Sequence, residues 1–142
     1  MIRDNKGQVS LEYLLIFAIS IAILIVFTLP LLENTIEDTF DVSDALEVKY
    51  DLSKITHAIK KVYGEGQGSK ETVSITASNE FKIYIAHNHI YSNLKLKSGS
   101  YKFIDDYYKS NLNKCSITIT KGENILVVEW PENIDGMIIY EG

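Results

Sequence analysis

The sequence predicts an α+β fold in which one long N-terminal helix packs on an antiparallel β-sheet. Three observations support this. The twenty residues from Tyr13 to Leu32 carry no charge. Apolar residues then recur every three or four positions between 45 and 62, which is the period of one helical face. Beyond the glycines at 64–68 the apolar period changes to two, which is typical of strands.

The uncharged run is long enough to span a bilayer. At ~1.5 Å per residue its twenty residues make a helix of about 30 Å. Within it, the Ser20 and Thr28 hydroxyls can bond to backbone carbonyls one turn earlier. A soluble helix with so long an uncharged run is uncommon. A secretory signal peptide would have a shorter run and a small-residue cleavage site, which residues 28–33 lack.

The charges on either side of the run predict its orientation. Arg3 and Lys6 precede it. Six acidic residues follow it: Glu33, Glu37, Asp38, Asp41, Asp44 and Glu47. The positive-inside rule therefore places the N-terminus in the cytoplasm and everything after Leu32 outside.

The segment Lys6-Gly7-Gln8-Val9-Ser10-Leu11-Glu12 resembles the processing site of archaeal type IV pilin-like precursors, which carry class III signal peptides. Gln8, Ser10 and Glu12 match the Q-x-S-x-E motif of that family, and Lys6 and Gly7 precede the cut. The resemblance implies that a prepilin peptidase cleaves between Gly7 and Gln8 and leaves the apolar segment on the mature protein. It covers at most the N-terminal third of the chain.

Two residues of this region are candidate assembly residues. Glu12 is an acid at the edge of the run, where a carboxylate costs less than the ~3 kcal/mol expected at mid-bilayer. It either extends to the lipid headgroups or, in a helical bundle, meets the α-amino group of Gln8 or the Ser10 hydroxyl of a neighbouring subunit. Pro30 lacks a backbone donor and is expected to bend or open the helix.

The sequence predicts five segments. Residues 1–7 form a cleaved leader, 8–32 the apolar helix, 33–63 its amphipathic continuation, 64–70 a flexible glycine-rich linker, and 71–142 a β-sheet head domain. The helical stripe comprises Ala45, Val48, Leu52, Ile55, Ile59 and Val62, and charged residues, Asp51 among them, are expected on the other faces. The segment from Glu33 to Asp44 is the weakest helix former.

Short strands are expected near residues 73–77, 81–85, 94–96, 101–103, 115–119, 125–130 and 137–140. Their apolar face needs a cover, and the helical stripe is the available one. We therefore expect Leu52, Ile55 and Ile59 to be buried against the sheet. Their expected partners are Ile75, Ile83, Ile117, Ile119 and Val127.

Other candidate sites are weak. His87 and His89 could begin a metal site, but no third ligand completes it, and a solvated loop is the better interpretation. His57 is expected to face solvent. The pair Asp105 and Asp106 is not a calcium loop; with Tyr107 and Tyr108 it is interpreted as a polar turn. Cys115, the single cysteine, is expected to be a buried free thiol on the same face as Ile117 and Ile119.

The leading functional hypothesis is a structural one: a pilin of an archaeal surface filament, with no enzymatic activity and no cofactor. Its partners would be the prepilin peptidase, other pilin subunits and the assembly machinery, with the membrane holding the precursor. A net charge of -5 without a basic stripe predicts no nucleic-acid partner. The alternative is a membrane-anchored surface domain for binding or adhesion that does not polymerise. An exported enzyme is disfavoured because no catalytic constellation is visible.

Overall fold

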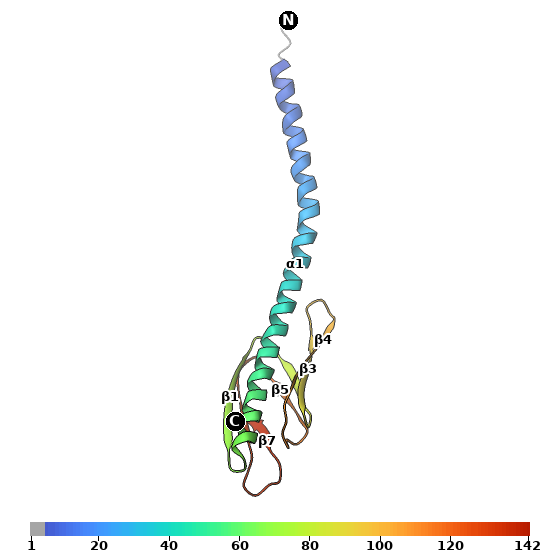
Figure 1. Ribbon diagram of the computed structural model, residues 1–142. Helices are drawn as coiled ribbons and strands as arrows, with labels where there is room; N and C mark the ends of the chain where they lie inside the picture. Colours follow the sequence, from blue (N-terminus) through green and yellow to red (C-terminus); the bar gives the residue numbers. More distant parts are fainter. Residues whose placement is uncertain (1–4) are drawn as a thin grey trace. The chain divides into compact units, whose positions relative to one another are not determined.

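The computed structural model describes the backbone of residues 5–142 and the side chains from Ser10 onward, except at residue 34. In that range the chain forms one helix, α1 (Asn5–Glu65), followed by seven strands (Figure 1). The chain divides into two compact units, residues 1–39 and residues 40–142, and we call the second unit the head. The α+β class predicted from the sequence is confirmed.

The strands of the head form two antiparallel sheets. The first has the order β1-β6-β7 and the second the order β4-β3-β2-β5. The strands are β1 (Lys70–Ala77), β2 (Phe81–Ile85), β3 (His89–Lys95), β4 (Tyr101–Tyr107), β5 (Cys115–Ile119), β6 (Gly122–Glu129) and β7 (Ile138–Glu141). All seven expected strands are present within the described residues, but the expectation of a single sheet is wrong.

The chain changes sheet between β1 and β2, and α1 holds this crossing in place. The Ser78 backbone N–H donates to the Glu47 carboxylate at 2.7 Å, and the Asn79 amide donates to Asp44 at 3.3 Å. On either side of this connection β1 pairs with β6 and β2 pairs with β5. β1 and β2 do not pair with each other, although consecutive strands in a simple hairpin would.

The predicted helical stripe is the centre of the core. All six of its residues are buried, and Leu52, Ile55 and Ile59 are fully inaccessible to solvent. They belong to one apolar cluster that also contains Ile75 of the first sheet and Ile83 of the second. The packing of the helix on both sheets therefore follows from the three-four period, as expected. Figure 1 shows the strands around the C-terminal part of α1.

One expected core partner faces the other way. Val127 is buried, yet it lies outside the central cluster, which contains its neighbours Leu126 and Val128 instead. The run Ile125–Val128 is apolar at every position, so its alternation does not reveal which residues point inward. The prediction for Val127 was wrong by one position.

Two acids of α1 are also buried, contrary to expectation for Asp51. Asp51 is 2% exposed, and its Oδ2 atom has no hydrogen-bond partner in the described structure. Burial raises the pKa of this carboxyl, while Lys54, whose Nζ lies 3.9 Å from Oδ1, acts in the opposite direction. Asp41 instead accepts the Lys97 backbone N–H at 2.7 Å and that of Ser98 at 3.3 Å. Burial alone would raise the pKa of Asp41, but these bonds hold it below its usual value.

The glycine-rich segment after α1 is tied to the head. Gly66 and Gly68 have φ values of +90° and +91°, which favour glycine and turn the chain sharply. The Ser69 hydroxyl donates to the Val62 carbonyl at 2.9 Å, and the Gly68 N–H donates to the Trp130 carbonyl at 2.7 Å. These bonds fix a segment that composition alone suggested to be a flexible joint.

Candidate assembly helix and other candidate sites

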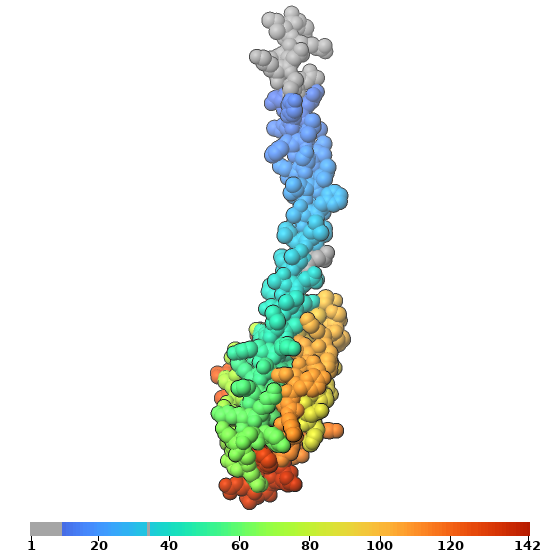
Figure 2. Space-filling view, in the orientation of Figure 1, coloured from blue at the N-terminus to red at the C-terminus, as the bar shows by residue number. Residues whose placement is uncertain are grey.

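The N-terminal part of α1 presents apolar side chains on every side. The described hydrophobic residues of the run are exposed, with Leu11, Tyr13, Phe17, Leu24, Phe27 and Leu31 all above 60%. This stretch has a mean hydropathy of 2.9, and none of it is buried within the unit. Among the described residues, α1 is the one helix that is long and apolar enough to cross a membrane. In Figure 2 the described part of the apolar run is the blue part of the chain.

Few polar groups interrupt this surface. The Ser20 hydroxyl donates to the Ile16 carbonyl at 2.8 Å, as expected, so the helix itself satisfies this donor. No such bond forms at Thr28 in the described structure. Glu12 lies on the helix with an exposed side chain at the start of the run. Its carboxylate is therefore free to meet a group outside the chain.

Pro30 lies inside α1, and the helix continues through it. The expected bend or local opening of the helix at this proline stays a prediction.

The processing motif lies at the edge of the described residues. Lys6, Gly7 and Gln8 are helical in their backbone, but their side chains lie outside the described residues, as does the whole of Arg3. The cut between Gly7 and Gln8 therefore stays a prediction from the motif. Ser10 and Glu12, whose side chains are described, are exposed.

Comparison with known proteins decides what this region is. The class III signal peptide family matches residues 5–31. The N-terminal region is a class III signal peptide, the kind that type IV pilin-like precursors carry. The match includes the motif and most of the apolar run, and the layout of one long helix on antiparallel sheets is that of a type IV pilin-like fold. No curated protein and no solved structure matches the chain.

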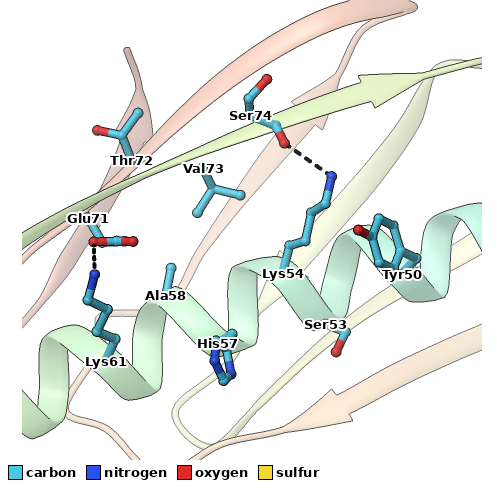
Figure 3. Close-up of a pocket in the computed structure, with 10 residues that line it drawn as sticks. All are labelled: Tyr50, Ser53, Lys54, His57, Ala58, Lys61, Glu71, Thr72, Val73 and Ser74. Atoms are coloured by element: carbon cyan, nitrogen blue, oxygen red, sulfur yellow. Dashed lines mark hydrogen bonds and ion pairs between the residues drawn. The ribbon is translucent and has the colours of Figure 1, made fainter.

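The head contains an open groove of about 450 Å³ between α1 and β1 (Figure 3). Lys61 bridges it through an ion pair with Glu71 at 2.7 Å, and Lys54 reaches the Ser74 carbonyl at 3.4 Å. His57 on the same side of α1 is exposed, as expected. The hydrogen bond and the charge of Glu71 raise the pKa of Lys61. These contacts hold the helix and the strand together.

Of the two histidines, only His89 lies in a different environment from the one predicted. His87 lies in a turn, but His89 begins β3. The centroid of the His89 ring lies 5.4 Å from that of Tyr91 and 5.9 Å from that of Tyr107. Among the described residues no group of three possible metal ligands occurs. His89 is thus part of an aromatic cluster on the outer face of the second sheet, with Tyr84, Tyr91, Phe103 and Tyr107.

Asp105 and Asp106 do not lie in a turn, so the prediction of a polar turn was wrong for them. Asp105, Asp106 and Tyr107 belong to β4, and the chain leaves the strand only at Tyr108. Tyr108 is buried, and its hydroxyl donates to the Ala86 carbonyl. Burial, together with the nearby Cys115 thiol, raises the pKa of Tyr108 to about 12.

Cys115 is a free thiol, as expected, but it is half-buried, whereas Ile117 and Ile119 on the same face are buried. Burial raises the pKa of the thiol, so it carries little thiolate at neutral pH. This environment suits a packing role and does not favour a nucleophile.

Sequence reasoning missed the apolar residues that the head leaves exposed. Val42 and Leu46 of α1 are 54% and 64% exposed although they lie within the amphipathic part of the helix. Ile134, in the loop before β7, is 47% exposed. The three-four period gave no signal for these residues, because they lie outside the buried stripe.

Proposed function

We propose that this protein is a structural subunit of an archaeal type IV pilus-like surface filament. The observation that carries the proposal is the juxtaposition of a class III signal peptide with an N-terminal part of α1 whose described apolar side chains are all exposed. A helix that is apolar on every side is stable in lipid or in the core of a helical bundle. A membrane precursor occupies the first environment and a filament subunit the second.

The order of events follows from this. The precursor spans the membrane with its N-terminus in the cytoplasm and its head outside. A prepilin peptidase removes residues 1–7, and the assembly machinery transfers the apolar helix from lipid into the filament. Because lipid is as apolar as the interior of a helical bundle, this transfer gains little hydrophobic free energy. Close helix packing and polar contacts must therefore favour the bundle.

Glu12 supplies such a contact in this proposal. Cleavage would create a free α-amino group on Gln8, with a reference pKa of about 8, and Glu12 of a neighbouring subunit would pair with it. In an apolar core an unpaired charge is strongly unfavourable, so the pair would fix the axial register between subunits. If Gln8 cyclises and loses its charge, the Ser10 hydroxyl is the remaining donor.

One observation favours the second candidate, an anchored surface domain that binds a target and never polymerises. The aromatic cluster on the outer face of the second sheet includes Phe103 and Tyr107, which are 57% and 63% exposed. Exposed aromatic clusters are typical of binding surfaces. In both candidates the protein has a binding or structural role and no catalytic one.

Replacing Glu12 by alanine separates the two candidates. In a lone anchor Glu12→Ala should be harmless, because hydrocarbon prefers alanine to a carboxylate. In a filament it should leave insertion and cleavage intact but abolish filaments, as counted by electron microscopy of cells that express only the variant. Glu12→Gln should be milder if the partner is a hydroxyl and about as severe if it is an amine. Wild-type filament numbers in Glu12→Ala cells would refute the role of Glu12 in register.

A further inference from the structure

We propose that the heads of successive subunits contact each other head to tail, with Ile134 of one copy inserted into a groove between α1 and β4 of the next. This inference rests on the proposed function, because it describes how the same subunits pack outside the apolar helical core. It concerns only residues of the head.

The groove has apolar walls that are open to solvent. Val42 and Leu46 of α1 form one wall and residues 102–105 of β4 the other, and the Val42 and Leu46 side chains are 54% and 64% exposed. Large apolar side chains that cluster around a hollow on a protein surface are typical of interaction sites. The groove is thus a place where a partner would remove the Val42 and Leu46 side chains from water.

The size of the groove limits what can occupy it. Its volume is about 170 Å³. Pockets for small molecules and cofactors usually measure ~300–1,000 Å³. The groove is too small for that class of ligand and suits a single large apolar side chain from another protein surface.

The head itself carries such a side chain. Ile134 is 47% exposed in the loop between β6 and β7, and the flanking residues Glu132 and Asp135 are exposed as well. The loop is held in place by the Gln67 amide, which donates to the carbonyls of Pro131 and Glu132 at 3.1 and 2.7 Å. A loop that is already ordered loses less conformational entropy when it binds.

The charges around the two surfaces are complementary. Exposed Lys49 and Lys102 line the groove, whereas Glu132 and Asp135 flank Ile134. None of these four takes part in an ion pair within the described part of the chain. Asp105 also lines the groove. The groove therefore has two positively charged residues and one negatively charged residue. Exposed ion pairs add little affinity, but they favour one orientation of docking.

The two surfaces lie at opposite ends of the head. Residues 42–49 are at the start of the head's part of α1, whereas the loop is bonded to Gln67, just beyond the end of the helix. From residue 46 to residue 65 the helix rises by ~28 Å. Figures 1 and 2 show β4 and the 131–136 loop at the two ends of the head. A contact between two different surfaces at opposite ends does not close on itself and builds an open filament.

Cross-linking tests this contact directly. In a full-length chain with Cys115→Ser, we would introduce Leu46→Cys and Ile134→Cys and treat cells with a short bis-maleimide. The double variant should give a ladder of covalent oligomers in the membrane and in sheared surface material. Each single variant should give no oligomers, because equivalent cysteines of two copies do not meet in a head-to-tail contact. A dimer from Ile134→Cys alone would overturn the proposed geometry.

Charge exchange gives an independent test with a matched control. Ile134→Lys should sharply reduce filament number, whereas Ile125→Lys should not. Ile125 is the matched control because it is 44% exposed and Ile134 is 47% exposed.

Lys49→Glu with Lys102→Glu should reduce assembly, as should Glu132→Lys with Asp135→Lys. Combining all four reversals should restore it. The amount of cleaved protein in the membrane shows whether each variant folds and is processed.

The outcomes separate this inference from the proposed function. If the wild-type protein forms filaments but the double-cysteine variant gives no ladder and Ile134→Lys assembles normally, the head contact is wrong and the filament role stands. If the wild-type protein forms neither filaments nor cross-linked oligomers, both are wrong. A ladder together with restoration by the charge exchange supports both.

Discussion

The apolar segment of α1 and the head use hydrophobic residues in opposite ways. In the segment from Ser10 to Leu32 apolar side chains occupy every face and all of them are exposed. In the head the same helix carries one apolar stripe, which is buried under two sheets. The difference lies in the arrangement of these residues around the helix, since both regions are rich in them. A stripe can be covered by the chain's own strands, whereas a helix that is apolar all round needs lipid or other helices.

The comparison also separates the functions of the two regions. The buried stripe stabilises the fold of one subunit. The apolar segment belongs to the other compact unit and is not buried, and in the proposed function it serves the membrane and assembly. Substitutions in the two regions should therefore fail in different assays.

The largest effect is expected from a charge placed in the apolar segment. Leu24 and Leu46 are both 64% exposed on α1, which makes them a matched pair. Leu24→Lys puts an ammonium group near mid-bilayer at a cost of ~3 kcal/mol and should strongly reduce membrane insertion. Leu46→Lys should insert like the wild type. Fractionation of cells into membrane and soluble protein checks both, and equal insertion of the two variants would contradict the distinction between the regions.

A smaller effect is expected from a cavity under the sheets. Ile55 is fully buried in the head, and Ile55→Ala should destabilise it by ~2–5 kcal/mol through lost burial and an unfilled cavity. Ile125, 44% exposed, is the control, and its replacement by alanine should change stability by no more than about 0.5 kcal/mol. Urea denaturation of a fragment that starts at Glu33 measures both. An unchanged midpoint for Ile55→Ala would mean that the helix does not cover the sheets.

The smallest effect is expected at Asp51. Its pKa is raised above the reference value of 3.8, so the folded head holds this proton more tightly than the unfolded chain. The stability from this group is therefore fully present below pH 3.8 and is lost as pH rises through the raised value. Asp51→Asn should raise the denaturation midpoint at neutral pH, and the gain should shrink toward acid pH. A gain that is the same at pH 3 and pH 7 would show that the carboxyl is not strained by burial.

Much of the difference between the apolar segment and the head was predictable from the sequence, because it depends on local periodicity. The stripe from Ala45 to Val62 and the seven strands are encoded in periods of three-four and two, which neighbouring residues reveal. The signal peptide was recognisable for a similar reason, since a peptidase reads a short linear motif from Lys6 to Glu12.

The features that were missed depend on contacts between distant residues. The division into two sheets follows from the pairing of β1 with β6, which lies about fifty residues further along the chain. The burial of Asp51 was overlooked because charged residues of the helix were expected to face solvent. Asp51 precedes Leu52 by one residue and Ile55 by four, which places it on the buried side of the helix. The groove between Leu46 and β4 could not be anticipated, because its walls come from two elements that are distant in the sequence.

The central claim is that the exposed apolar helix becomes the N-terminus of a filament subunit. The most direct test is mass spectrometry of the N-terminal peptide from filaments sheared off wild-type cells. We predict a mature chain that begins at Gln8, with or without cyclisation of that glutamine, and that lacks residues 1–7. Gly7→Phe should block the cut and leave the precursor in the membrane. Filaments whose subunits retain Met1 and Arg3 would contradict the claim.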